Sequence, residues 1–183
     1  NANPDIAEFN VVVPTGNFGN ILAAYYAKCM GVPIKKLICA SNANNVLTDF
    51  INTGKYDRNR KFFTTISPSM DILISSNLER LLYSIAGSEK VTNWMKQLSE
   101  NGKYEVDKDT LAAIKDQFAA GCCDDEATKA TIAKIFKEKN YLCDTHTAVA
   151  VKVFYDYKAE TGDNTPAVIA STASPFGKRK LRA

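Results

Sequence analysis

An α/β fold with a parallel sheet and flanking helices is predicted by the alternation of two kinds of pattern along the chain. The strand patterns cover 9–13, 35–40 and 166–171, and the helical patterns cover 20–30 and 43–53. Such alternation is typical of parallel strands connected by helices. Gly31 and Gly54 follow the two helical patterns, as expected where a helix ends. With 183 residues, 45% of them hydrophobic, the chain is large enough to bury a core.

Amphipathic helices are predicted between about residues 78 and 160, where apolar residues recur at spacings of three and four. The apolar positions are Leu78, Leu81, Leu82, Ile85, Leu111, Ile114, Phe118, Ile132, Ile135 and Phe136. Acidic residues at 107–109 and 124–126 favour helix starts, and Lys134, Lys137 and Lys139 favour a helix end. Asn101-Gly-Lys103 is the expected loop tip. We interpret most of this region as scaffold.

The distribution of charge argues against a nucleic-acid surface. The net charge is +3, but four basic residues lie between 178 and 182, so that the remainder is close to neutral. No basic stripe is interleaved with aromatic residues. No apolar run reaches the roughly 20 residues of a membrane helix. These observations predict no nucleic-acid partner, no membrane association and a cytoplasmic location.

The five cysteines indicate neither a disulfide framework nor a metal site, since their number is odd and none forms a Cys-x-x-Cys pair. Cys29 and Cys39 occupy helical and strand patterns in which a small thiol packs well. Cys122 and Cys123 are expected in a loop, where they could be exposed.

Residues 14–20, Pro-Thr-Gly-Asn-Phe-Gly-Asn, join the strand pattern to the first helical pattern. Gly16 and Gly19 allow a tight turn and a close approach to an anion, and the N–H groups that open a helix carry partial positive charge. The loop has neither the Gly-Lys-Ser/Thr of a Walker A loop nor the Gly-x-Gly-x-x-Gly of dinucleotide sites. It fits a single phosphate monoester, and the alternative is a turn that only packs the helix on the sheet.

A second group of polar residues, Ser75-Ser-Asn-Leu-Glu-Arg80, opens a predicted helix. It fits an N-cap followed by an exposed arginine. It also fits a second anion site, in which helix N–H groups and a guanidinium hold phosphate oxygens.

Six motifs in one order resemble the threonine synthase family, which uses pyridoxal phosphate (PLP) and has a tryptophan-synthase-β-like fold. The motifs lie at 14–20, 40–50 (Ala-Ser-Asn-Ala-Asn-Asn-Val-Leu-Thr-Asp-Phe), 67–72, 75–80, 144–149 and 171–176. Each is weak alone, but together they span about residues 9 to 176. The resemblance implies the C-terminal portion of that fold, with residues 1–176 in the PLP-binding catalytic domain.

The resemblance also assigns roles to individual residues. The residues implied in PLP binding are Gly16, Asn17, Phe18, Gly19, Asn20 and Thr172, the last through the pyridine nitrogen. The residues implied in binding the phosphate of the substrate, O-phospho-L-homoserine, are Ser76, Asn77 and Arg80, with Ser75 a weaker candidate. In the family the Schiff-base lysine lies upstream of the phosphate loop, so we expect it outside this chain, which then holds no catalytic residue of its own.

Two stretches depart from the family pattern. Thr145 stands where the motif around His146 usually has proline, and we expect this histidine to line or brace the site. After Pro175 the family continues with x-Lys-Phe, whereas this chain continues Phe-Gly-Lys-Arg. Residues 177–183 therefore form an atypical basic tail, and no role is assigned to Lys178.

Three functions remain open at this point. The first is a piece of a threonine synthase, which converts O-phospho-L-homoserine and water to L-threonine and phosphate, the piece being inactive alone. The second is a related phospholyase that releases a keto acid and ammonia. The third is a non-catalytic module that binds a phosphorylated ligand.

Overall fold

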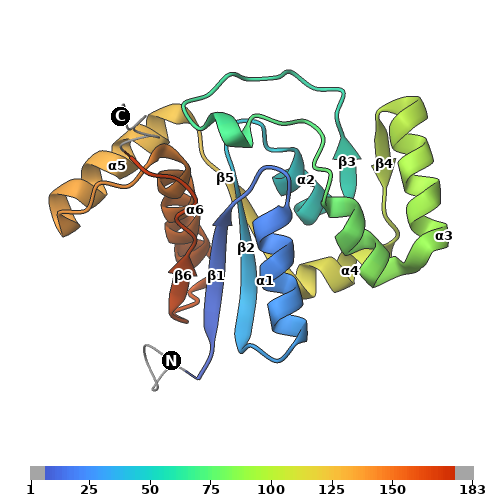
Figure 1. The fold of residues 1–183 in the computed structure, drawn as a ribbon, viewed down its shortest axis with the longest axis horizontal. Helices are drawn as coiled ribbons and strands as arrows, with labels where there is room; N and C mark the ends of the chain where they lie inside the picture. The colour runs from blue at the N-terminus through green and yellow to red at the C-terminus, as the bar shows by residue number, and fades with distance from the viewer. Residues whose placement is uncertain (1–6, 176–183) are drawn as a thin grey trace, which may run out of the picture.

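A four-stranded parallel sheet forms the centre of the computed structural model, which describes residues 7–175 (Figure 1). The strands in spatial order are β5 (Phe118–Cys122), β2 (Ile34–Ser41), β1 (Phe9–Pro14) and β6 (Ala167–Ile169). All three strand pairs are parallel, which confirms the predicted α/β class. The predicted basic tail, 177–183, lies outside the described residues.

Helices cover both faces of this sheet. On one face lie α1 (Gly19–Cys29), α2 (Val46–Thr53) and α4 (Lys108–Gln117). On the other lies α6 (Thr145–Thr161), against which α5 (Asp125–Lys139) packs (Figure 1). Residues of β1 and β2 alternate between the two cores, as the twofold period of a strand requires. Val13, Leu37 and Cys39 join the core of the first face, whereas Val12, Ile38 and Ala40 join the core beneath α6.

The predicted helix boundaries hold to within a few residues, because side chains and glycines at the ends satisfy the backbone. Gly54 ends α2 with φ +79°, a left-handed conformation that costs glycine little. Asp107 and Asp124 accept N–H groups in the first turns of α4 and α5. The second helical pattern, expected from residue 43, begins only at Val46.

A second, two-stranded antiparallel sheet, absent from the sequence predictions, joins β3 (Lys55–Asp57) to β4 (Lys103–Glu105). The rings of Tyr56 and Tyr104 stack across it with centroids 5.2 Å apart. Between these strands run the 3-10 turn η1 (Pro68–Met70) and α3 (Leu78–Asn101). The expected loop tip at 101–103 is a tight turn, in which Gly102 ends α3 and Lys103 begins β4.

Three expectations from the sequence are wrong. Phe118, assigned to a helical pattern, begins β5, where pairing with Leu37 of β2 outweighs the local period. Cys29 lies at the exposed end of α1 instead of packing inside. Cys122 ends β5 and is exposed, but Cys123 is buried beneath α6 and does not belong to an exposed loop. All five thiols are free.

None of the helices within residues 7–175 is both long and apolar enough to cross a membrane.

Hydrogen bonds of Asp163 connect the segment between α6 and β6 to the amino ends of β1 and β2. Its carboxylate accepts hydrogen bonds from Asn10 Nδ2 at 3.0 Å, Lys35 Nζ at 3.0 Å and the Tyr157 hydroxyl at 2.9 Å. It also accepts from the Thr165 hydroxyl and N–H. The Thr165 hydroxyl first, then Asn10 and Lys35, hold the pKa of this carboxyl well below its ordinary value.

We expect Asp163→Asn to lower the free energy of unfolding by about 2 kcal/mol at neutral pH, because charge-assisted hydrogen bonds to a 10% exposed side chain are weakened. A carboxyl with a lowered folded-state pKa stabilises fully above its ordinary value of 3.8 and loses that contribution as the pH falls below it. The variant should therefore lose less stability in acid than the parent does. Urea unfolding at several pH values measures both effects.

The matched control is Asp156→Asn, which removes an ion pair with Lys152 on α6 whose side chains are more exposed than that of Asp163. Exposed pairs at this helical spacing contribute about 0.5 kcal/mol or less. Equal losses from the two substitutions would contradict the role given to Asp163.

Candidate functional site

The candidate site lies at the edge of the sheet where the parallel strands end. Four segments leave this edge: 15–18 after β1, 42–45 after β2, 123–124 after β5 and 170–174 after β6. Open α/β sheets bind ligands at this edge because the following loops and helix starts meet there. Two stretches distant in sequence, the loop after β1 and Thr172, therefore line one cavity.

The loop after β1 is shaped by Phe18, which has a left-handed backbone with φ +63° and precedes α1. Its side chain is 1% exposed and packs against Phe118, with ring centroids 5.7 Å apart. The ring therefore belongs to the core, and only the backbone of Phe18 is available to a ligand. Helix geometry leaves the N–H groups of Gly19, Asn20 and Ile21 without acceptors inside α1, and these residues line the cavity.

Gly16 is required by a close approach between two backbones. A Cβ atom at this position would lie 2.6 Å from the carbonyl oxygen of Ser69 in η1. At Gly19 a Cβ atom would meet nothing closer than 3.6 Å, from Asn77 Nδ2. A side chain at position 16 would thus clash with Ser69, whereas position 19 has room for a methyl group.

Residues before α3 hold the carbonyl groups of the loop. The Ser75 hydroxyl donates to Gly16 O at 2.9 Å, and Asn77 Nδ2 donates to Asn17 O at 2.7 Å. Tyr56 supports this segment, because its hydroxyl accepts the Ser75 N–H at 2.9 Å and donates to Leu73 O. Burial raises the pKa of Tyr56 to about 12, so the phenol stays protonated. The loop carbonyls are thereby occupied, and the loop offers donors to a ligand.

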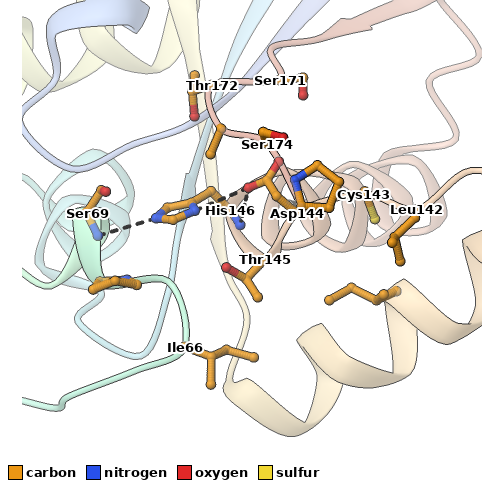
Figure 2. A pocket seen from close by; sticks show the side chains of 14 residues that line it. Ile66, Ser69, Leu142, Cys143, Asp144, Thr145, His146, Ser171, Thr172 and Ser174 are labelled. Carbon is orange, nitrogen blue, oxygen red and sulfur yellow. Dashed lines mark hydrogen bonds and ion pairs between the residues drawn. The ribbon is translucent and has the colours of Figure 1, made fainter. Parts of the chain in front are cut away.

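The cavity formed by this loop has a volume of about 300 Å³. All six residues predicted to bind the cofactor line it: Gly16, Asn17, Phe18, Gly19, Asn20 and Thr172. A larger cavity of about 890 Å³ continues from it (Figure 2) and shares Ser69, His146, Thr172 and Ala173. The six residues are therefore brought together, with donors at one end and a threonine hydroxyl at the other.

His146 lies between these two cavities at the start of α6 (Figure 2). Its Nε2 accepts the Ser69 N–H at 3.3 Å, and its Nδ1 lies 3.2 Å from Asp144 Oδ1. Asp144 caps α6 by accepting the N–H groups of His146 and Thr147. The histidine thus links the start of α6 to η1 within the lining of both cavities, and its role in the site stays a prediction.

The residues predicted to bind the substrate phosphate lie around another cavity, of about 410 Å³. Its lining includes Ser76 and Arg80 together with Tyr26, Glu79, Tyr83 and Val91, and it shares no residue with the loop cavity. Asn77 connects the two places, because its Oδ1 accepts from Arg80 while its Nδ2 donates to the loop. The three residues are adjacent, but only Ser76 and Arg80 face this cavity.

A polar network that the sequence analysis missed fixes the segment before η1. The Asp71 carboxylate accepts from Asn42 Nδ2 at 2.7 Å, Asn44 Nδ2 at 3.0 Å and the Thr65 hydroxyl at 2.7 Å. Asn42 and Asn44 are 1% and 3% exposed. The asparagine-rich stretch directly after a predicted strand was the available signal. Residues 7–175 hold no group of three or more acidic, cysteine or histidine side chains arranged for a metal ion.

We expect Gly16→Ala to lower the free energy of unfolding by about 2 kcal/mol, the usual cost of forcing an atom into a closely packed contact. Gly19→Ala, on the same loop, has space for its methyl group and should change stability by less than about 1 kcal/mol. Denaturant unfolding of both variants measures the difference. Equal effects would refute the contact between Gly16 and Ser69.

No family model matches the chain. Over 172 residues it is 46% identical to threonine synthase-like 1 from Macaca fascicularis, which covers 92% of this chain and 23% of that protein. Over 187 residues it is 42% identical to threonine synthase from Saccharomyces cerevisiae, covering 93% of this chain and 36% of that enzyme.

Solved structures agree with these relatives. PLP-bound threonine synthase from Brucella melitensis superposes with a TM-score of 0.86 and 40% identity, over 94% of this chain and 36% of that one. The chain therefore spans only 23% to 36% of the length of the proteins it matches. Because nearly all of it aligns with them in sequence and in fold, the chain belongs to the threonine synthase family.

Proposed function

We propose that this chain forms the phosphate-binding part of a PLP-dependent threonine synthase. The observation that carries the proposal is the single cavity that joins the donor-rich loop Gly16–Asn20 to the Thr172 hydroxyl. It is supported by 40% identity to a threonine synthase whose structure contains PLP. The conversion proposed for the whole protein is that of O-phospho-L-homoserine and water to L-threonine and phosphate.

The residues present fit PLP in two respects. The loop carbonyls are engaged by Ser75 and Asn77, so that helix-opening N–H groups are left for a phosphate. The Thr172 hydroxyl, on the other wall, is suited to hydrogen-bond the pyridine nitrogen. When bound, PLP supplies an electron sink for proton removal from the substrate carbons.

Arg80 and Ser76 are proposed to hold the phosphate of the substrate. Both side chains are exposed at the cavity of about 410 Å³. The guanidinium of Arg80 donates one hydrogen bond to Asn77 and retains further N–H donors. A guanidinium binds phosphate oxygens through paired, charge-assisted hydrogen bonds. In this role Arg80 orients the leaving group and stabilises its charge as it departs.

The covalent attachment of PLP is proposed to come from outside this chain. No lysine is among the described residues that line the loop cavity or the larger cavity beside it. The 183-residue chain alone should therefore bind PLP weakly and show no turnover. Residues 1–176 are proposed as part of a larger catalytic domain, and a cytoplasmic location remains a prediction from the sequence.

The second candidate is a phospholyase related to threonine synthase. The chain is 46% identical to a protein named threonine synthase-like 1 and 42% identical to the yeast threonine synthase, so its relatives include proteins that do not carry the name threonine synthase itself. Both candidates use the same phosphate sites, so that the products must separate them.

The deciding experiment supplies O-phospho-L-homoserine and PLP to the full-length protein that contains this sequence, and quantifies the products. We expect L-threonine and phosphate in equal amounts, with little ammonia. Keto acid and ammonia in place of threonine would establish the phospholyase. Binding of phosphate esters without either reaction would leave only the non-catalytic module.

We expect Arg80→Ala in the same full-length protein to weaken binding of the phosphorylated substrate by about tenfold or more, because charge-assisted hydrogen bonds are lost. The matched control is Lys90→Ala, beyond the kink at Gly87 of α3, whose exposed ammonium pairs with Asp107 and does not line this cavity. Inhibition by inorganic phosphate measures the affinity of both variants. Unchanged affinity in Arg80→Ala would refute the assignment.

A further inference from the structure

His146, the single histidine of the chain, is largely but not fully buried and lines both the loop cavity and the larger cavity beside it. Its side chain is 12% exposed and that of Asp144 is 5% exposed. The imidazole spans from the start of α6 to η1, with Asp144 at Nδ1 and the Ser69 N–H at Nε2 (Figure 2). Which atom donates and which accepts in these two hydrogen bonds decides the protonation state of the His146 imidazole.

A backbone N–H only donates, so Nε2 must carry a lone pair to accept from Ser69. The neutral imidazole then bears its proton on Nδ1, where the Asp144 carboxylate accepts it. Protonation of Nε2 would place two donors against each other and break the bond to Ser69. The bond to Asp144 would remain.

The bond to Ser69 matters because the other side of the same peptide segment contacts the loop. The Ser69 carbonyl oxygen is the atom that leaves no space for a side chain at Gly16. Met70, the next residue, is 2% exposed in the core beneath α6. A shift of Ser69 away from His146 is therefore transmitted directly to the backbone that opens the loop.

We propose that His146 is a positioning residue whose unprotonated Nε2 holds Ser69 against Gly16, so that the anion affinity of the loop depends on the neutral imidazole. The inference rests on the proposed function only in taking the loop cavity as the ligand site.

Other titratable groups lie around this contact. Among the described residues that line the two cavities, they are Asp144 and Cys143. Burial raises the pKa of the Cys143 thiol, which stays neutral. Asp125 of α5 faces the same segment through the Ile66 N–H at 3.3 Å, and Asp71 faces it through Thr65. Of the groups named, only Asp144 contacts the imidazole, and it does so at Nδ1, away from the bond between Nε2 and Ser69.

The first test is NMR of the full 183-residue chain with uniform ¹⁵N labelling, in which His146 gives the only imidazole signals. At about pH 8 we expect the Nδ1–H tautomer, with Nε2 unprotonated. Between about pH 8 and about pH 5 the Ser69 amide signal should shift together with the imidazole signals. An Nε2–H tautomer, or a Ser69 amide that does not follow the titration, would overturn the inference.

The second test compares two variants by their affinity for inorganic sulfate, whose charge does not change over this range. His146→Gln places an acceptor near the Nε2 position at every pH, so its affinity should vary little with pH. His146→Asn retains a donor toward Asp144 but is too short to reach Ser69, and should bind weakly throughout. The parent chain should bind sulfate about fivefold more weakly at the lower pH, the effect of losing one neutral hydrogen bond. Tighter binding at the lower pH, as the positive charge of an imidazolium in the lining of the cavity alone would give, would overturn the inference.

The outcomes separate this inference from the proposed function. An identical pH dependence in the parent chain and in His146→Gln would overturn the role of His146. Failure of every form to bind sulfate would instead refute the loop as an anion site, and the tautomer and the Ser69 amide would still decide whether His146 holds the wall.

Discussion

Parallel pairing of β1 with both of its neighbours is the constraint on which the site depends. Val12 lies opposite Ile38 of β2 and Ile169 of β6, so the three strands advance in register and end at the same edge. The loop after β1 and the residues after β6 consequently face each other across one cavity. Neither the loop after β1 nor the segment after β6 could form the cavity alone, because each contributes only part of its lining. The helices on both faces stabilise this register by burying alternate residues of the strands.

The partly buried carboxylate of Asp71 positions the irregular segment between β3 and α3. This segment has little regular secondary structure, so its position depends on side-chain hydrogen bonds. Three side-chain donors and the Thr65 N–H converge on one carboxylate, and two of the donors are amides with almost no solvent exposure. Leaving such amides unpaired would cost about 1 to 3 kcal/mol each. The network therefore favours one arrangement of the segment, with η1 beside Gly16.

Local signals predicted the sheet, most helices and the loop, because each of these is encoded within a few neighbouring residues. The strand that begins at Phe118 was missed because its apolar residues continue a helical period, and its conformation is decided by pairing with β2. The pairing of β3 with β4 was missed for the same reason: two three-residue strands, separated by a long helix, carry no local pattern. The buried side chain of Phe18 and the contact between Gly16 and Ser69 depend on tertiary packing that periodicity does not encode.

Asn77 has a double engagement that limits what it can do for a substrate. Its Nδ2 holds the carbonyl of Asn17, and its Oδ1 accepts from Arg80. An anion that draws Arg80 away would free the oxygen but leave the bond to Asn17 intact, since the two ends of the amide are separate groups. If Asn77 donated to the anion itself, the loop would lose this support. Arg80 and the exposed Ser76 can therefore bind a phosphate without disturbing the loop. Asn77 instead supports the loop through Asn17 and positions the guanidinium of Arg80.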